Sequence, residues 1–322
     1  EENLEFIAEL ETRDNGKPAF ESARVDLPFV VSNFRYFAGW ADKLAGDVIP
    51  VSGPFLNYTL REPLGVIGAI IPWNFPLNIA SWKLAPALAC GNAVILKPAE
   101  ETPLTALLLG ELALEAGFPP GIVNVIPGRG PVTGQAMVEH PGIDKIAFTG
   151  STETGRIVMK TAAESLKKVS LELGGKSPNV VFADADLKAA VRGAITGIFY
   201  GKGEVCAAGS RLFVEASIKD EFMEQLASKA AGMTVGDPNH PKTRLGAIVS
   251  KGQHERVLSY IEAGIAEGAT LRTGGQAATV DGRGYFVEAT VFDDVTPDMT
   301  IAREEIFGPV LATLAFEDLD DA

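Results

Sequence analysis

Residues 64–100 read LGVIGAIIPWNFPLNIASWKLAPALACGNAVILKPAE, and this stretch decides the fold. Leu64–Ile71 is a short apolar run typical of a buried strand, Asn78–Cys90 has the composition of a helix, and Ala93–Leu96 is a second apolar run. Two buried strands joined by a helix require a crossover connection, which makes the strands parallel. The stretch therefore predicts the first β-α-β unit of a parallel sheet.

The same alternation of strands and helices continues downstream. It predicts a helix over Pro103–Ala116, a strand over Ile122–Ile126, a helix over Val132–Val138, a strand over Ile143–Phe148, a helix opening near Ser151 and a strand over Lys168–Leu173. Such a series gives a parallel sheet with helices on both faces. We expect a Rossmann-like cofactor domain whose ligands lie at the carboxyl ends of its strands.

The domain organisation follows from interruptions of this pattern. Gly174-Gly175, followed by Pro178, predicts a boundary between domains. A second α/β series then begins, with strands over Asn179–Ala183 and Leu212–Glu215 and helices over Leu187–Phe199 and Phe222–Ala231. Before residue 44 the apolar spacing predicts helix, and the weak alternation of 47–61, broken by Gly53-Pro54, predicts a hairpin. We therefore divide the chain into a helical part (1–44), a hairpin (45–63), a parallel α/β domain (64–174) and a second α/β domain (175–322).

Composition restricts the class of protein and its partners. The 322 residues include 42 Asp and Glu against 28 Lys and Arg, for a net charge of −14. An acidic chain of this kind disfavours nucleic acid and anionic membranes as partners, and no apolar run is long enough to cross a bilayer. Two cysteines, Cys90 and Cys206, fit a reducing compartment, so we expect a cytoplasmic protein and no metal site. The first residue is not Met, so a targeting segment could precede it.

Three polar clusters follow predicted strands of the cofactor domain. Asn74 stands between Trp73 and Phe75, where its amide could donate into a cleft or could merely cap the next helix. Lys97 and Glu100 follow the strand Ala93–Leu96 and could reach a ribose or phosphate, although two solvated loop charges would look the same.

Gly150 and Ser151 form the third of these clusters, where a strand ends and a helix begins. A helix N-terminus offers unpaired N–H groups and a partial positive charge, which suit a pyrophosphate. A simple cap of Ser or Thr followed by Glu explains the same residues nearly as well.

The fourth cluster pairs Glu172 with Cys206. Glu172 lies at the end of an apolar strand, where a desolvated carboxyl would be prepared as a base, or would be part of a buried ion pair. Cys206 lies among glycines and small residues, so a substrate could approach its sulfur; the alternative is a small packed residue. Cys90 stands in an apolar context, and we expect it to be inert packing.

Taken together and in this order, these motifs resemble the aldehyde dehydrogenase superfamily, and the resemblance extends to Glu304-Glu305-Ile306-Phe307-Gly308-Pro309. It implies that Cys206 attacks an aldehyde as the thiolate, that Asn74 and the Cys206 backbone N–H hold the oxyanion, and that Glu172 activates the water that hydrolyses the thioester. It also implies a hairpin used in oligomer contacts and a homodimer or homotetramer for the full-length protein.

The resemblance implies NAD as cofactor, with NADP possible but less preferred because Glu100 would repel a 2′-phosphate. Its implied contacts are Lys97 and Glu100 for the adenosine ribose, Gly150 and Ser151 for the pyrophosphate, Glu305 for the nicotinamide ribose, Phe307 near the nicotinamide ring and Trp73 along the cofactor channel.

This sequence departs from the family's pattern just before the cysteine. The family usually shows Asn-Gln-Gly-Gln there, and this chain has Gly201-Lys202-Gly203-Glu204. Family chains also begin before Glu1 and continue beyond Ala322. The resemblance therefore implies that 1–44 and 64–174 belong to the cofactor domain and that 175–322 is an incomplete catalytic domain. Two alternatives to a hydrolytic enzyme therefore stay open: a CoA-acylating relative, which Glu172 disfavours, and a non-catalytic fragment or structural relative. The largely apolar helix after Asn74 favours an aliphatic or aromatic aldehyde over a charged one.

Overall fold

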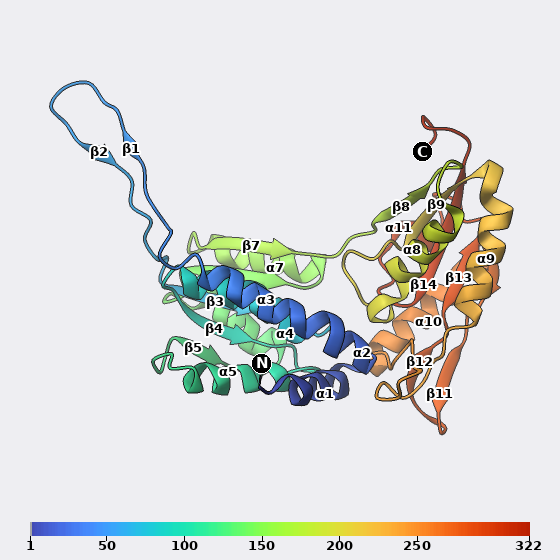
Figure 1. The fold of residues 1–322 in the computed structure, drawn as a ribbon, viewed down its shortest axis with the longest axis horizontal. Coiled ribbons are helices and arrows are strands. Elements are labelled where there is room, and N and C mark those ends of the chain that lie inside the picture. The colour runs from blue at the N-terminus through green and yellow to red at the C-terminus, as the bar shows by residue number, and fades with distance from the viewer. Residues whose placement is uncertain (1) are drawn as a thin grey trace. The chain divides into compact units, whose positions relative to one another are not determined.

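The computed structural model describes residues 2–322, and its contacts divide the chain into two compact units (Figure 1). The first unit comprises the chain up to Glu11 together with Ala23–Leu173, and the second comprises Thr12–Ser22 together with Gly174–Ala322. The division at 173/174 falls beside the glycines that interrupt the sequence pattern. The segment Thr12–Ser22, which the sequence placed with the cofactor domain, groups with the second unit.

The first unit is built on a five-stranded, wholly parallel sheet. Its strands are β3 (Val66–Ile70), β4 (Ala93–Lys97), β5 (Val123–Val125), β6 (Lys145–Thr149) and β7 (Lys168–Glu172), in the order β5-β4-β3-β6-β7. The strand order reverses between β3 and β6, so the loops after these two strands flank a topological switch point. The prediction of a Rossmann-like parallel sheet is confirmed.

Two helices precede these strands in the chain, α1 (Leu4–Asn15), which continues into the second unit, and α3 (Leu27–Ala38). The strands are connected by α4 (Pro76–Ala89), α5 (Leu104–Glu115), α6 (Gln135–Glu139) and α7 (Thr152–Ala163). A π-helical turn over Gly130–Gly134 leads into α6, so residues 132–134, expected as the start of an α-helix, are π-helical instead. The branched and aromatic residues of β3 and β6 pack against α6 and α7, in a core that includes Ile70, Ile146, Phe148 and Val158.

Between α3 and β3 lies a two-stranded antiparallel hairpin of β1 (Val48–Ile49) and β2 (Asn57–Tyr58). It extends away from the sheet of the first unit (Figure 1). Its tip exposes apolar side chains, with Phe55 74% and Leu56 75% exposed. The predicted hairpin is therefore present, and its use in oligomer contacts stays a prediction.

The second unit contains a five-stranded mixed sheet. Its strands are β8 (Pro178–Val181), β9 (Arg211–Glu215), β10 (Thr270–Thr273), β13 (Thr290–Asp293) and β14 (Val310–Phe316), in the order β10-β13-β14-β9-β8. Only β10 runs antiparallel to its neighbour. A separate hairpin joins β11 (Ala277–Val280) to β12 (Arg283–Val287).

The helices of this unit are α8 (Leu187–Phe199), α9 (Lys219–Ala231), α10 (Lys251–Ala266) and α11 (Thr300–Arg303), with the short α2 (Ala19–Glu21) from the N-terminal segment. One core packs α8 and α9 on the sheet, and a second packs α10 and α11 on it. The expected second α/β series is thereby confirmed.

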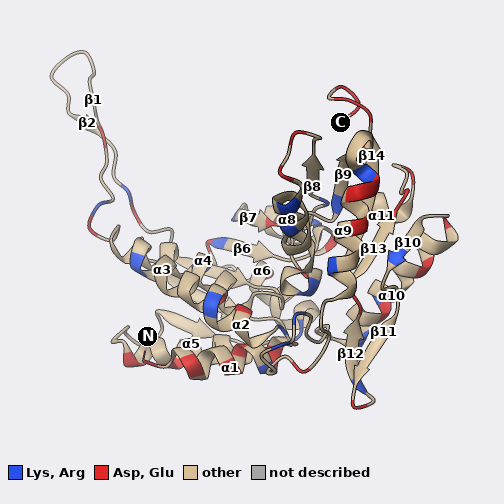
Figure 2. Ribbon diagram, turned by 45° about the vertical axis from the view of Figure 1, so that its right-hand side comes forward, with Lys and Arg blue, Asp and Glu red and all other residues tan. Residues whose placement is uncertain are grey.

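The acidic balance of the chain is visible on its surface. Figure 2 shows acidic residues along α1 and α5 in the first unit, where Glu5, Glu9, Glu111 and Glu115 are exposed. Within residues 2–322 no helix combines the length and the apolar character needed to cross a membrane.

Candidate functional site

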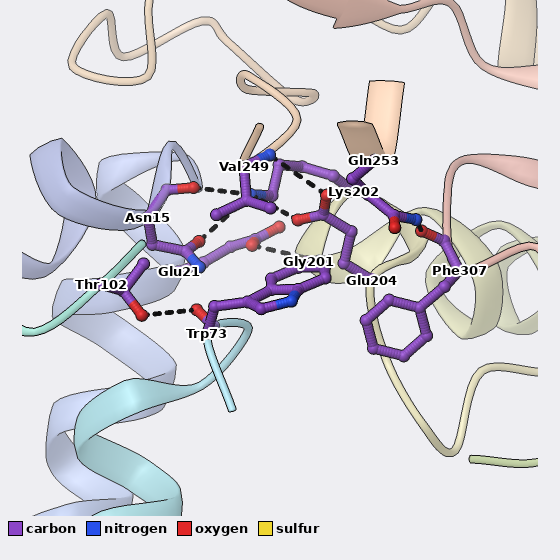
Figure 3. Close-up of polar contacts among 10 residues, drawn as sticks. All are labelled: Asn15, Glu21, Trp73, Thr102, Gly201, Lys202, Glu204, Val249, Gln253 and Phe307. Carbon is purple, nitrogen blue, oxygen red and sulfur yellow. Dashed lines mark hydrogen bonds and ion pairs between the residues drawn. The ribbon is translucent and has the colours of Figure 1, made fainter. Parts of the chain in front are cut away.

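The loop after β3 carries Trp73 and Asn74 to one side of the switch point. Asn74 is 6% exposed, and the helix that follows begins at Pro76 with Phe75 as its N-cap residue. Asn74 is therefore not the N-cap of α4, although it does lie in the bend directly before that helix, as the simpler explanation expects. The carbonyl of Trp73 accepts a hydrogen bond from Thr102 Oγ1 at 3.2 Å, which fixes the backbone beside Asn74 (Figure 3).

Lys97 and Glu100 follow β4 and differ sharply in exposure. The Lys97 side chain is 3% exposed, donates from Nζ to the Pro98 carbonyl at 2.7 Å and pairs with Glu100 Oε2 at 3.4 Å. The Glu100 side chain is 45% exposed. Its partial burial favours a higher pKa, but backbone N–H groups, including that of Gly130, and nearby Lys97 hold the pKa of Glu100 below its usual value. Lys97 is not a solvated loop charge, and Glu100 presents an ionised carboxylate to solvent.

Gly150 and Ser151 lie on the other side of the switch point, between β6 and α7. A Cβ at Gly150 would lie 2.5 Å from the Phe148 ring, so only glycine fits there. Ser151 caps α7, since its Oγ accepts from Thr154 N at 3.2 Å. The third helical residue is Thr154 and not a glutamate, so the observed cap is the Ser151 hydroxyl and not the capping box of Ser followed by Glu. This cap leaves the helix N-terminus available to an anion, because one cap satisfies only one of the orphan N–H groups of a first turn.

Glu172 contradicts the expectation of a desolvated carboxyl. It is exposed, because β7 is the edge strand of the sheet and Glu172 is its last residue. An edge strand has a neighbour on one side only, so an apolar sequence there does not imply burial of the strand end.

A cavity of about 440 Å³ in the first unit brings Glu172 together with a residue that sequence reasoning missed. Lys83, on α4, lines this cavity with Glu172, Lys145 and Trp82. The pKa of Lys83 is lowered to about 8, chiefly by burial; the charge of Glu172 opposes this shift and that of Lys145 adds to it. The signal available in the sequence was one lysine within the otherwise apolar helix Asn78–Cys90.

Cys206 lies in the second unit at the end of a tightly coiled loop. Gly201, Lys202 and Gly203 have φ values of 57°, 63° and 73°, three consecutive residues in the left-handed region. Cys206 follows three residues later and is partly exposed. A Cβ at Gly175 would lie 3.9 Å from the Cys206 carbonyl, so the Gly174-Gly175 turn passes directly beside the cysteine.

Glu305 and Phe307 lie near the same turn. Glu305 Oε1 accepts from Gly175 N at 3.2 Å, and a Cβ at Gly174 would collide with the Glu305 carboxylate. Burial raises the pKa of Glu305, although the Gly175 N–H, Arg256 and Lys176 oppose the shift. Phe307 has a φ of 61°, and its carbonyl accepts from Gln253 Nε2 at 2.7 Å.

Lys176 is a second residue of this region that sequence reasoning missed. Its Nζ is buried and has no hydrogen-bond partner among the described residues. The pKa of Lys176 is lowered to about 8, chiefly by burial; the charge of Arg211 adds to this shift and that of Glu305 opposes it. The turn, Glu305, Lys176 and Cys206 thus form one polar cluster within the second unit.

Cys90 is not the packed residue that we expected. It is exposed, because α4 ends at Ala89 and Gly91 turns the chain away with a φ of 78°. Both cysteines remain thiols. No group of three His, Cys, Asp or Glu side chains within residues 2–322 could hold a metal ion.

Comparison with known proteins finds relatives that match this chain along its whole length. The chain matches the sequence model of the Aldehyde dehydrogenase family over residues 1–322. It is 52% identical over 322 residues to two human (Homo sapiens) proteins, Retinal dehydrogenase 2 and Aldehyde dehydrogenase, mitochondrial, covering 100% of this chain and 62% of each relative. A solved NAD+ complex of an aldehyde dehydrogenase from Bacillus cereus is 51% identical with a TM-score of 0.97, covering 99% of this chain and 65% of that one.

The chain thus spans less than two thirds of the length of these relatives, but the match includes every motif discussed above. A family sequence model that covers all 322 residues and a fold that superposes at this TM-score lead to one conclusion: the chain belongs to the aldehyde dehydrogenase family.

Proposed function

We propose that the protein oxidises an aldehyde to a carboxylic acid, with water as the source of the second oxygen, reduction of NAD+ to NADH and release of a proton. The observation that carries the proposal is Cys206, a partly exposed thiol on a left-handed loop directly beside the Gly174-Gly175 turn. A nucleophilic thiol needs both access and a defined position. Membership of the aldehyde dehydrogenase family supports the same chemistry.

In the proposed mechanism the Cys206 thiolate adds to the carbonyl carbon, and the oxyanion accepts hydrogen bonds from the Asn74 amide and the Cys206 backbone N–H. Bound NAD supplies the acceptor for the hydride that leaves this carbon, so that a thioester remains on Cys206. Glu172 takes a proton from water, the hydroxyl adds to the thioester carbon, and the C–S bond breaks to release the acid.

Lys83 enters the proposal as a partner of Glu172. Both line one cavity of the first unit, and a lysine with a pKa of about 8 exchanges its proton near neutral pH. An exposed Glu172 is in contact with solvent and can lose the proton that it takes up. Lys83 offers a nearby site through which that proton can pass.

NAD is the cofactor that the residues fit. In the first unit, Lys97 and Glu100 at the end of β4 would hold the adenosine ribose, and the start of α7 after Gly150 would meet the pyrophosphate. Gly150 leaves no room for a side chain there. Glu305, Phe307 and Trp73 complete the proposed contacts, with Glu305 on the nicotinamide ribose. The solved relative from Bacillus cereus is itself an NAD+ complex, which supports this choice.

We further propose an apolar aldehyde as substrate. Phe29 on α3 and Trp82 on α4 pack edge to face, with ring centroids 6.2 Å apart, and remain 50% and 42% exposed. One relative is named Retinal dehydrogenase 2, and retinal is an apolar aldehyde. The exposed apolar hairpin tip supports the proposal that β1 and β2 contact a second copy of the chain.

The test is a single assay with three arms. NADH formation at 340 nm is followed with hexanal, with benzaldehyde and with succinate semialdehyde, each with and without CoA. We expect NADH and free acid from the first two without CoA. NADH that requires CoA would identify an acylating enzyme, and no NADH in any arm would identify a non-catalytic relative.

A further inference from the structure

The second unit contains four charged side chains that the mechanism does not use, all buried within it. Lys17, Glu21, Lys202 and Glu204, here called the buried charge quartet, are between 1% and 2% exposed. Two carry positive and two carry negative charge, so the quartet is neutral as a whole. Charges are almost never buried in this way unless they are paired.

The quartet is organised around the loop that leads to the cysteine, residues 200–206, here called the cysteine loop. Lys202 Nζ pairs with Glu204 Oε2 at 2.7 Å. Lys202 also donates to the backbone carbonyl of Asn15 at 2.9 Å and to its Oδ1 at 3.2 Å. Figure 3 shows Lys202 lying between Asn15 and Glu204.

Further hydrogen bonds of the quartet join the cysteine loop to other segments of the second unit. Glu21 Oε2 accepts from Gly201 N at 3.1 Å, and Glu204 Oε1 accepts from Val249 N at 3.3 Å (Figure 3). Lys17 is close enough to act electrostatically on both Lys202 and Glu204. A Cβ at Gly203 would collide with the Gly308 backbone, so the loop is also pressed against the segment that contains Phe307.

Stability alone does not explain this arrangement. Replacing a buried ion pair by apolar residues of similar volume is often neutral or stabilising, whereas removing one partner is strongly destabilising. The best-attested use of buried polar groups is to fix a register. Here they join the end of α1 to a loop 187 residues away in the sequence, and the loop has a conformation that L-residues rarely adopt.

We propose that the buried charge quartet positions the cysteine loop, so that the sulfur of Cys206 is presented in one orientation. The four are positioning residues, and the inference rests on Cys206 as the proposed nucleophile. Glu204 is two residues from Cys206. Where the family usually has Asn-Gln-Gly-Gln, this chain has two charged residues, and these are Lys202 and Glu204. A charge pair thus stands where the family usually has two amides.

The experiment is a double-mutant cycle with Lys202→Gln, Glu204→Gln and the pair combined. Each single change leaves the quartet with one uncompensated charge. The double change restores neutrality, and the two new amide side chains can hydrogen-bond to each other, to Asn15 and to the Val249 backbone. The readout is the rate at which iodoacetamide alkylates Cys206, followed by mass spectrometry, with the exposed Cys90 as the internal reference. Steady-state kcat and the KM for NAD are measured in parallel.

We expect each single variant to lose about tenfold in Cys206 alkylation and in kcat, with the KM for NAD within about twofold, and the double variant to return to within about threefold of the unchanged protein. A matched control is Lys219→Met, which removes ion pairs with Asp293 and Asp294 elsewhere in the unit and should leave Cys206 alkylation unchanged. Folded single variants with unchanged Cys206 alkylation, or a double variant no faster than either single, would overturn the proposal.

If the single variants do not fold, Asn15→Ala takes their place. It removes one acceptor of Lys202 and changes no charge, and it should slow alkylation of Cys206 by about threefold without slowing that of Cys90. An unchanged rate at Cys206 would again overturn the proposal. Failure of the proposed function looks different: either the unchanged protein would form no NADH from any aldehyde, or Cys206→Ser would retain dehydrogenase activity, whatever the alkylation cycle shows.

Discussion

The two cysteines of this protein stand in opposite circumstances. Cys90 is the more exposed, but it lies just past a helix end, where the chain turns away at Gly91. Cys206 is only partly exposed, and the residues before it are held by buried charges and by three left-handed backbone conformations. If exposure made a nucleophile, Cys90 would be the better candidate. The comparison teaches that a reactive position is defined by what holds the backbone, with access as a second condition.

Replacing each cysteine in turn tests this difference most directly, and we expect the largest change in kcat from these variants. Cys206→Ser should lower kcat by more than about a thousandfold, because a serine hydroxyl is a far weaker nucleophile than a thiolate. NAD binding, measured by fluorescence titration, should change little. Cys90→Ser is the control and should keep at least about half of the activity. Loss of turnover in Cys90→Ser with retention in Cys206→Ser would reverse the assignment.

Glu172 extends the comparison of exposed and held residues, because it is exposed like Cys90 but has a proposed catalytic role. Glu172→Gln keeps the shape of the side chain but cannot accept a proton, so thioester hydrolysis should slow by about a hundredfold or more. Stopped-flow absorbance should show a burst of about one equivalent of NADH per site, followed by slow turnover. Absence of the burst would mean that Glu172 acts before the thioester forms.

Lys97 and Glu100, the proposed contacts of the adenosine ribose, also differ in exposure. Lys97 is buried and bonded to the Pro98 carbonyl, whereas Glu100 faces solvent. One like-charge contact with a 2′-phosphate at about 4 Å costs on the order of 4 kcal/mol at an effective dielectric of about 20. Solvent and Lys97 reduce this cost, so we expect a preference for NAD over NADP of about tenfold to a hundredfold. In Glu100→Gln the ratio of kcat/KM for NAD to kcat/KM for NADP should decrease. Equal use of both cofactors by the unchanged protein would show that Glu100 does not face the ribose.

The smallest effect concerns Lys83 and the pH dependence of acid release. The pKa of Lys83 is lowered to about 8, so its neutral form increases as pH rises through this value. The rate of thioester hydrolysis should therefore rise by a few-fold, roughly threefold, between about pH 7 and 9, and Lys83→Met should flatten this rise. Lys145→Met removes a charge that lowers the pKa of Lys83, so it should move the rise to higher pH. A profile that both variants leave unchanged would exclude Lys83.

The sequence predicts the parallel sheet of the first unit well, because runs such as Leu64–Ile71 are apolar, short and followed by helices. It does not predict that β7 is an edge strand, since strand order depends on contacts between distant segments. The exposure of Glu172 could not be foreseen for that reason. The prediction that Cys90 is packed was wrong for a similar reason, because its apolar neighbours belong to α4 and the cysteine lies beyond the end of that helix.

The candidate residues at strand ends were found because short polar motifs interrupt apolar runs. Lys83 and Lys176 were missed, since each is one lysine whose burial is decided by packing that no local pattern reveals. The buried charge quartet was invisible for the same reason. Lys17 and Glu21 look like ordinary surface charges in the sequence, and only the fold brings them to residues 200–206.

The assignment of Thr12–Ser22 to the second unit has a consequence for how that unit can be made. The backbone passes between the units three times, at 11/12, 22/23 and 173/174. A recombinant fragment that begins at Gly174 would therefore lack Asn15, Lys17 and Glu21, and its Lys202 and Glu204 would lose the groups that surround them. Such a fragment should fold correctly only when a synthetic peptide of residues 12–22 is added in trans, or when that peptide is fused to it in a permuted chain. The unit that contains Cys206 is thus not one contiguous stretch of the chain.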